Sequence, residues 1–199
     1  MQPFLEPGAQ LAHLLELGGR RAPAAAFIFG ASRRGAPADL DPVVGIVAHL
    51  EGCASFDNLG QAERLLGVRA GRVVARSRDH WTVPWGFTDD RLFLNRALLL
   101  VSTMAPEELL GEVLAIETTL GRRRTGGHRY GARTIDIDLL LIAGSVVNSP
   151  GLEVPHPRMR ERTFALAPAA DVAPGWVHPL LGRTVLQLLN DLLQNPVGA

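Results

Sequence analysis

The chain has 199 residues, and its 20 basic and 20 acidic residues give a formal net charge of zero. Its length suits one domain with an appendage, and the zero net charge disfavours a general nucleic-acid binder, which needs a basic surface to gather phosphate groups. All 20 basic residues are arginines, so any phosphate site must be built from planar guanidinium groups.

The sequence also limits the compartment in which the chain works. Its single cysteine, Cys53, cannot form an internal disulfide. No apolar run reaches the ~18 residues of a membrane span, and the N-terminus lacks the basic region and apolar core of a signal peptide. We therefore expect a cytoplasmic protein.

The first forty residues are rich in Gly, Pro, Ala and Arg and contain only one short helical stripe. We interpret residues 1–42 as an N-terminal extension and residues 43–199 as the folded domain. At the start of this domain, the residue patterns predict a buried strand over Val43–Leu50, a short amphipathic helix over Asn58–Leu66 and a second strand over Arg72–Ser77.

A loop with the sequence HWTVPWGFTDDR follows from His80 and carries two tryptophans and a phenylalanine. Bulky aromatic residues are unusual in a loop, and they indicate the wall of a binding site. Next come a third predicted strand over Leu92–Val101 and the clearest predicted helix, Ser102–Leu120, which has a proline in its first turn and ends at Gly121.

Two aspartates lie two residues apart in a strand-like segment, RYGARTIDIDLLLIAG. Because side chains alternate along a strand, Asp136 and Asp138 share one face, while Ile135, Ile137 and Leu139 share the other. At a separation of roughly 7 Å the two carboxylates would repel each other, unless a bound divalent cation compensates. The alternative is a solvated strand face or a charged guard of a sheet edge.

An arginine-rich loop, GRRRTGGHRYGAR, lies directly before the aspartates. A cationic loop beside paired carboxylates suits nucleotide phosphates, because the acids can hold magnesium while the arginines help to neutralise the phosphate charge. A solvated loop that pairs with the aspartates directly is the alternative. Downstream, His156 and Arg162 are each weak indications of a site when taken alone.

The chain ends in a predicted amphipathic helix from about Thr184 to Leu193. Across the whole sequence, the predicted helices and strands are mixed without strict βαβ alternation. We therefore expect an α+β sandwich of antiparallel sheet and packed helices.

The run from Ile116 to Pro174, IETTLGRRRTGGHRYGARTIDIDLLLIAGSVVNSPGLEVPHPRMRERTFALAPAADVAP, resembles the 6-hydroxymethyl-7,8-dihydropterin pyrophosphokinase family. The family's G-R-x-R, its loop ending in R-(W/Y)-G-x-R-T, and its D-x-D, V-P-H-P and R-x-F motifs occur here in order. Upstream, W-T-V-P-W-G-F and F-L-N extend the resemblance, more weakly, back to Val43. The resemblance implies a ferredoxin-like αβα fold and an enzyme that transfers diphosphate from ATP to 6-hydroxymethyl-7,8-dihydropterin in folate biosynthesis, releasing AMP.

The resemblance also implies roles for individual residues. Asp136 and Asp138 would bind two magnesium ions, and Arg122 and Arg133 would be catalytic, nearest the transferring group. The other ATP-binding residues would be Glu117, Arg124, Arg129, His156 and Arg162. The pterin ring would lie between two phenylalanines, and the pterin-binding residues would be Thr82, Val83, Trp85, Phe93, Asn95, Tyr130 and Phe164. We expect a monomer with these two small-molecule substrates and no nucleic-acid or membrane partner.

Some residues depart from the family pattern. The first strand, usually followed by G-S-N-L, has two imperfect candidates, FIFGASRRG from Phe27 and HLEGCASFDNL from His49, and the second gives the family's spacing from Asn58 to Thr82. The usual asparagine is missing from both, and Ala132 stands where proline is common in an arginine loop that is one residue longer. Two alternatives follow: a catalytically weakened nucleotide-binding homologue, and an RNA-binding ferredoxin-like module, which the zero net charge disfavours.

Overall fold

The protein is described by a computed structural model, which covers residues 44–53, 56–83, 92–121 and 135–195. Its main sheet is antiparallel, with the strand order β2-β4-β1-β5 and with β3 paired to β4. These strands are β1 (Val44–Cys53), β2 (Arg72–Arg76), β3 (His80–Thr82), β4 (Phe93–Ser102) and β5 (Asp136–Ile142). The predicted N-terminal extension, residues 1–42, and residues 122–134 of the arginine-rich loop and its flank lie outside the described residues.

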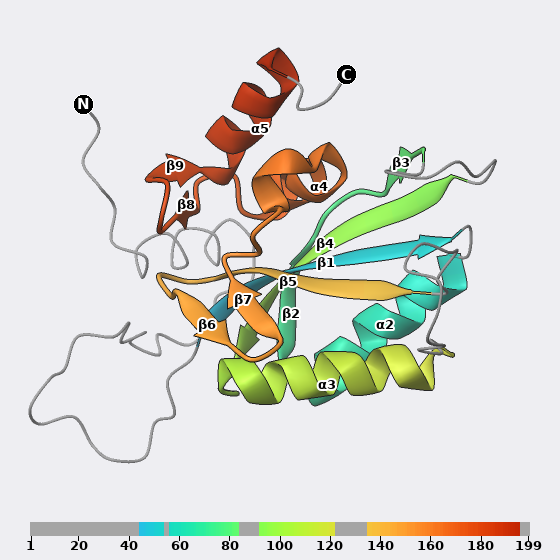
Figure 1. Cartoon of the computed structure of the whole chain (residues 1–199). Helices are drawn as coiled ribbons and strands as arrows, with labels where there is room; N and C mark the ends of the chain where they lie inside the picture. Colours follow the sequence, from blue (N-terminus) through green and yellow to red (C-terminus); the bar gives the residue numbers. More distant parts are fainter. Residues whose placement is uncertain (1–43, 54–55, 84–91, 122–134, 196–199) are drawn as a thin grey trace, which may run out of the picture.

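Helices cover both faces of this sheet, as Figure 1 shows. Helices α2 (Phe56–Arg69) and α3 (Pro106–Thr119) lie on one face, and α4 (Thr163–Val172) and α5 (Val185–Gln194) lie on the other. Side chains of β4 alternate between the two cores: Leu94 and Leu98 pack with α2 and α3, whereas Ala97 and Leu99 pack with α4 and α5. The predicted ferredoxin-like αβα sandwich is therefore confirmed.

Local chemistry explains where the predicted elements begin and end. Helix α3 begins at Pro106, later than Ser102, because β4 continues through Ser102 and Glu108 reaches back to accept a hydrogen bond from the Ala105 N–H at 3.1 Å. Helix α5 begins after Thr184, whose hydroxyl accepts from the Gln187 N–H at 3.1 Å. Of the two candidate first strands, the favoured one, from His49, coincides with the second half of β1, and the one at Phe27 lies outside the described residues.

Several elements do not appear in the sequence-based prediction. Strand β3 occupies the start of the loop predicted to carry aromatic residues, and α4 was not predicted at all. Two short hairpins are also new, β6 (Val147–Ser149) with β7 (Leu152–Val154), and β8 (Val177–His178) with β9 (Arg183–Thr184), together with a 3-10 turn, η1 (Met159–Glu161). Among the described helices, none is long and apolar enough to cross a membrane.

Candidate active site

Strand β5 presents the two aspartates on the face predicted for them. Asp136 and Asp138 are half-buried, while Ile135, Ile137 and Leu139 are buried in the core beneath α2 and α3. The acids therefore face the side of the sheet that α4 covers. In the described sheet β5 is an end strand, paired to β1 only, so these carboxylates lie beside a rim that a ligand can approach.

Arg162 connects the aspartates to the start of α4. Its Nη1 atom lies 3.5 Å from Asp138 Oδ2, and its guanidinium carbon lies 5.5 Å from the centroid of the Phe164 ring. The second distance is within the range of a cation–π contact. One arginine thus joins an acidic residue of β5 to an aromatic ring at the N-terminal end of α4. A residue predicted to bind metal, Asp138, therefore lies close to one predicted to bind pterin, Phe164.

His156 lies beside β5 because its backbone N–H donates to the Leu140 carbonyl at 2.9 Å. Burial lowers the pKa of this imidazole below 6.5, and the Asp138 carboxylate, which acts in the opposite direction, does not outweigh it. The ring Nδ1 accepts a hydrogen bond from the Arg158 N–H at 3.2 Å. A neutral imidazole whose Nδ1 is an acceptor carries its proton on Nε2.

Glu117 fastens α3 to β5 between the two aspartates. Its side chain is 1% exposed, and its Oε1 atom accepts a hydrogen bond from the Ile137 N–H at 2.8 Å. This bond joins the helix to the residue between Asp136 and Asp138. It therefore fixes the position of β5 relative to α3. The predicted nucleotide residue therefore also has a structural task.

A cavity of about 550 Å³ opens between α3, β5 and the β6–β7 hairpin. Two leucines of α3 give it an apolar wall, and carboxylates and a histidine occupy the β5 side. Such a mixture suits a ligand with a flat apolar part and a charged part. The residues that line it include Leu110, Leu114, Glu117, Asp136, Asp138 and His156.

A second group of predicted residues gathers where β3 pairs with β4. Asn95 is fully buried, and its Nδ2 atom donates to Thr82 Oγ1 at 2.9 Å, to the Phe93 carbonyl at 3.2 Å and to the His80 carbonyl at 3.3 Å. The orientation of the amide is therefore fixed by the protein. Phe93 and Asn95 alternate with Leu94 and so face the α4 side, the side of Phe164. Val83 follows β3 and is largely exposed.

The sequence-based prediction missed polar residues that frame this site. The strand register pairs Glu51 of β1 with Asn95 on one side and with Asp136 on the other, so the three residues form a row across three strands on one face. The sequence-based prediction also missed Arg96 and Asp171, because their partners lie far away in the sequence. The remaining predicted site residues lie outside the described residues: Trp85, Arg122, Arg124, Arg129, Tyr130 and Arg133.

Comparison with known proteins gives consistent matches. The family model of 7,8-dihydro-6-hydroxymethylpterin-pyrophosphokinase (HPPK) matches residues 52–174. A protein of Methylorubrum extorquens named 2-amino-4-hydroxy-6-hydroxymethyldihydropteridine pyrophosphokinase is 44% identical over 133 residues, which cover 67% of this chain and 82% of that protein. A protein of the same name from Porphyromonas gingivalis is 44% identical over 123 residues, covering 61% of this chain and 83% of that one.

Among solved structures, an HPPK-DHPS variant of Plasmodium falciparum matches with a TM-score of 0.63 and 14% identity over 79% of this chain. The match covers 46% of that longer chain. At this identity the likeness concerns the fold alone.

Proposed function

Because this chain belongs to the 7,8-dihydro-6-hydroxymethylpterin-pyrophosphokinase family, we propose that the described site carries the family's transfer of diphosphate from ATP to 6-hydroxymethyl-7,8-dihydropterin. The chain is a diphosphotransferase of folate biosynthesis, with ATP as co-substrate and AMP as the second product. The resemblance predicted from the sequence is confirmed by the family match. Family membership also favours this function over the RNA-binding alternative, whereas reduced catalytic efficiency stays open to an assay.

The observation that carries the residue assignment is the meeting of Asp138, Arg162 and Phe164 at one place. A carboxylate for a cation, a guanidinium group for phosphate and an aromatic ring for a flat heterocycle are the three chemistries that this reaction needs. The apolar and acidic cavity beside Glu117 gives the nucleotide a place next to them. ATP and pterin would then approach each other above the aspartate face of β5.

The aspartates fit magnesium bound together with ATP better than a metal held by the protein alone. Within the described ranges, no group of three or more His, Cys, Asp or Glu side chains could hold a metal ion. Magnesium commonly takes one or two protein carboxylates and completes its octahedron with phosphate oxygens and water. We assign Asp136 and Asp138 to two magnesium ions, which when bound would neutralise charge on the phosphate chain.

His156 and Arg162 would contact the phosphate chain. The lowered pKa keeps His156 neutral at pH 7, and its Nε2–H is the donor that a phosphate oxygen would meet. Arg162 would exchange part of its contact with Asp138 for phosphate oxygens, which a planar guanidinium group can bind in pairs. In this arrangement both side chains would bind the negative charge of the phosphate chain while the diphosphate is transferred.

The pterin would lie on the α4 side of β3 and β4. Phe93 and Phe164 offer the ring faces, while the Asn95 amide, with Thr82 and the backbone near Val83, would bind the polar edge. The orientation of Asn95 is set before the substrate arrives, which lowers the entropic cost of recognition.

Some assignments rest on the family pattern alone. Arg122 and Arg133 as catalytic residues, Arg124 and Arg129 as phosphate contacts, and Trp85 and Tyr130 at the pterin remain predictions. So do the two-ion count, the monomeric state and the cytoplasmic location, the first two of which metal titration and size-exclusion chromatography would test.

The deciding experiment incubates the purified chain with ATP, magnesium and 6-hydroxymethyl-7,8-dihydropterin and follows the nucleotides by chromatography. We expect AMP in equal amount to the diphosphorylated pterin. AMP formed without the pterin, or ADP in place of AMP, would contradict the proposal. Asp191→Ala is a suitable control variant, since its carboxylate pairs with Arg183 of β9 and does not line the cavity.

A further inference from the structure

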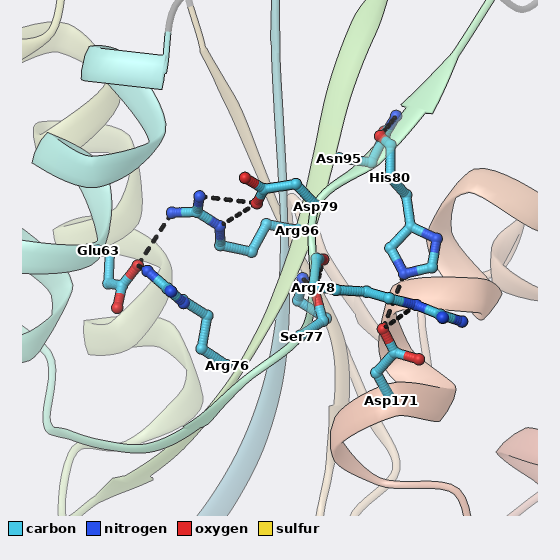
Figure 2. A network of polar contacts seen from close by, with 10 residues as sticks. Glu63, Arg76, Ser77, Arg78, Asp79, His80, Asn95, Arg96 and Asp171 are labelled. Atoms are coloured by element: carbon cyan, nitrogen blue, oxygen red, sulfur yellow. Dashed lines mark hydrogen bonds and ion pairs between the residues drawn. The ribbon is translucent and has the colours of Figure 1, made fainter.

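The segment of residues 77–80, which comprises the connection from β2 and the first residue of β3, makes polar contacts on both faces of the sheet (Figure 2). Arg78 and His80 both reach the Asp171 carboxylate of α4, at 3.2 and 2.8 Å. Asp79, between them, reaches Arg96 on the other side of β4, where Nε lies 2.8 Å from Asp79 Oδ1. Successive side chains of an extended chain point in opposite directions, so neighbouring residues are anchored to different layers of the fold.

Arg96 is the anchor on the α2 side. Its side chain is only 6% exposed and contacts two carboxylates, with Nη2 2.7 Å from Asp79 Oδ1 and Nη1 3.0 Å from Glu63 Oε2 of α2. Arg76 lies 3.6 Å from the same Glu63 oxygen. A planar guanidinium group with two fixed partners is a stiff link, because moving either partner leaves a buried charge without compensation.

Asp171 is the anchor on the α4 side. It lies in the last turn of α4, where a negative charge opposes the helix dipole, so its presence does not stabilise the helix itself. Its Oδ2 atom instead receives both Arg78 and His80, and the His80 contact joins residues 91 positions apart. The carboxylate therefore ties α4, the helix that carries Phe164, to the residues that enter β3.

These anchors act directly beside the Asn95 amide. Strand β3 has three residues and pairs, within the described sheet, with β4 only. Two of the three acceptors of Asn95 Nδ2, the His80 carbonyl and Thr82 Oγ1, belong to β3. A shift of residues 78–80 would therefore move the groups that orient the amide.

We propose that Arg96 and Asp171 are positioning residues for the pterin: from opposite faces of the sheet they fix residues 78–80, and through them the acceptors that orient Asn95. This inference rests on the proposed function, which places Asn95 in the pterin site. It predicts an effect on one substrate only, since the nucleotide cavity is lined by α3, β5 and the segment from Asn148 to Pro157, and includes none of residues 77–80.

The test compares two binding titrations by calorimetry. The variants are Arg96→Met, which keeps most of the stem and removes the charge, and Asp171→Ala. Pterin is titrated in the presence of magnesium and a non-hydrolysable ATP analogue, and the analogue is titrated alone. We expect the Kd for pterin to rise about fivefold in each variant, as befits one misplaced hydrogen-bonding group, while the Kd for the analogue stays within about twofold.

Two matched controls remove ion pairs of the same kind elsewhere. Arg69→Met breaks the 2.8 Å contact between Arg69 of α2 and Glu112 of α3, and Asp191→Ala breaks the 2.8 Å contact with Arg183. Both should keep the wild-type Kd for pterin. If the controls weaken pterin binding as much as the test variants do, the effect is general destabilisation and the inference is overturned.

Further outcomes separate this inference from the proposed function. If Arg96→Met does not fold, Asp171→Ala decides alone, because its carboxylate lies closer to solvent. An unchanged pterin Kd in folded Asp171→Ala, with an active wild type, overturns the positioning role and leaves the function intact. A wild type that neither binds pterin nor releases AMP contradicts the proposed function itself.

Discussion

On β5, Asp136 and Asp138 face the same way because they are two residues apart on one strand. On β4, Asn95 is oriented by partners on β3, and β3 is held in turn by contacts that join residues 17 and 91 positions apart. The proposed nucleotide side of the site thus follows from local geometry, whereas the proposed pterin side depends on the packing of three layers.

This difference has a consequence for substitutions. Changing an aspartate on β5 would remove a proposed magnesium ligand but leave the strand in place, because the strand is held by its backbone ladder and by the buried Ile137 and Leu139. Changing a residue that holds β3 moves groups that the substitution itself does not touch. Replacing an aspartate of β5 should therefore cause a severe loss of the reaction rate without unfolding the protein. Replacing a residue that holds β3 should cause a moderate loss of affinity for pterin alone.

The largest effect should come from Asp138→Ala or Asp136→Ala. Either change would remove one of the proposed magnesium ligands, and we expect the rate of AMP release to fall at least about 100-fold, the equivalent of roughly 2.7 kcal/mol. The fold should persist, because both side chains are half-buried and the core face of β5 is unchanged. Steady-state kinetics and thermal unfolding check the two claims. Near-normal turnover in either variant would remove the metal assignment.

Substitutions on the proposed pterin side should weaken pterin binding more than they lower the reaction rate. Phe93→Ala and Phe164→Ala each remove one ring face, and stacking contributes about 0.5–1.5 kcal/mol beyond the area buried, so the pterin Kd should rise about tenfold or more. ATP affinity should change little for Phe93→Ala, because Phe93 does not line the cavity proposed for the nucleotide. Calorimetric titration of both ligands measures this, and an equal loss of ATP and pterin affinity in Phe93→Ala would contradict the division between the two sides.

The sequence predicts the nucleotide side well because its signals are periodic. Alternation alone places Asp136 and Asp138 opposite Ile135, Ile137 and Leu139, and the structure has this arrangement. The helix α3 and the strands β2 and β4 also follow from local patterns within a few residues.

The elements on the proposed pterin side could not be predicted from periodic patterns in the sequence. Helix α4 buries one face, but Ala167 and Ala170 outside that face are apolar too, and Pro168 lies inside the helix, so its sequence shows no clear amphipathic stripe. Strand β3 has only three residues and gives no period to detect. Nothing in the sequence relates Arg96 to Glu63 or His80 to Asp171, because these pairs exist only after the layers have packed.

Substitutions at Glu117 should have a smaller effect, on stability, and they test whether α3 holds β5 in place. Glu117→Ala leaves the buried Ile137 N–H without its acceptor, and we expect the free energy of unfolding to fall by about 1 kcal/mol. Glu117→Gln keeps a carbonyl oxygen at the same position and is the matched control, which should retain most of the stability. Urea denaturation measures both. Equal stabilities of the Ala and Gln variants would show that this bond does not hold β5 against α3.

The smallest expected effect is a pH dependence of the free energy of unfolding. It arises from one histidine at the proposed site and one elsewhere in the fold. Burial lowers the pKa of His156, beside β5, and of His178, in β8, below 6.5. The unfolded chain therefore binds more protons than the folded chain just below pH 6.5. The free energy of unfolding is fully maintained above that pH and decreases as the pH falls through it.

His156→Gln and His178→Gln should each make this decrease shallower, by less than about 1.4 kcal/mol per pH unit, which is the limit for one proton. Urea denaturation of the metal-free protein at a series of pH values measures the slopes, and a variant with the wild-type slope would exclude its histidine as a source. Repeating the series with magnesium and a non-hydrolysable ATP analogue should change the contribution of His156 and leave that of His178 alone, because only His156 lines the nucleotide cavity. A change in both contributions would mean that nucleotide binding reaches beyond the β5 side of the site.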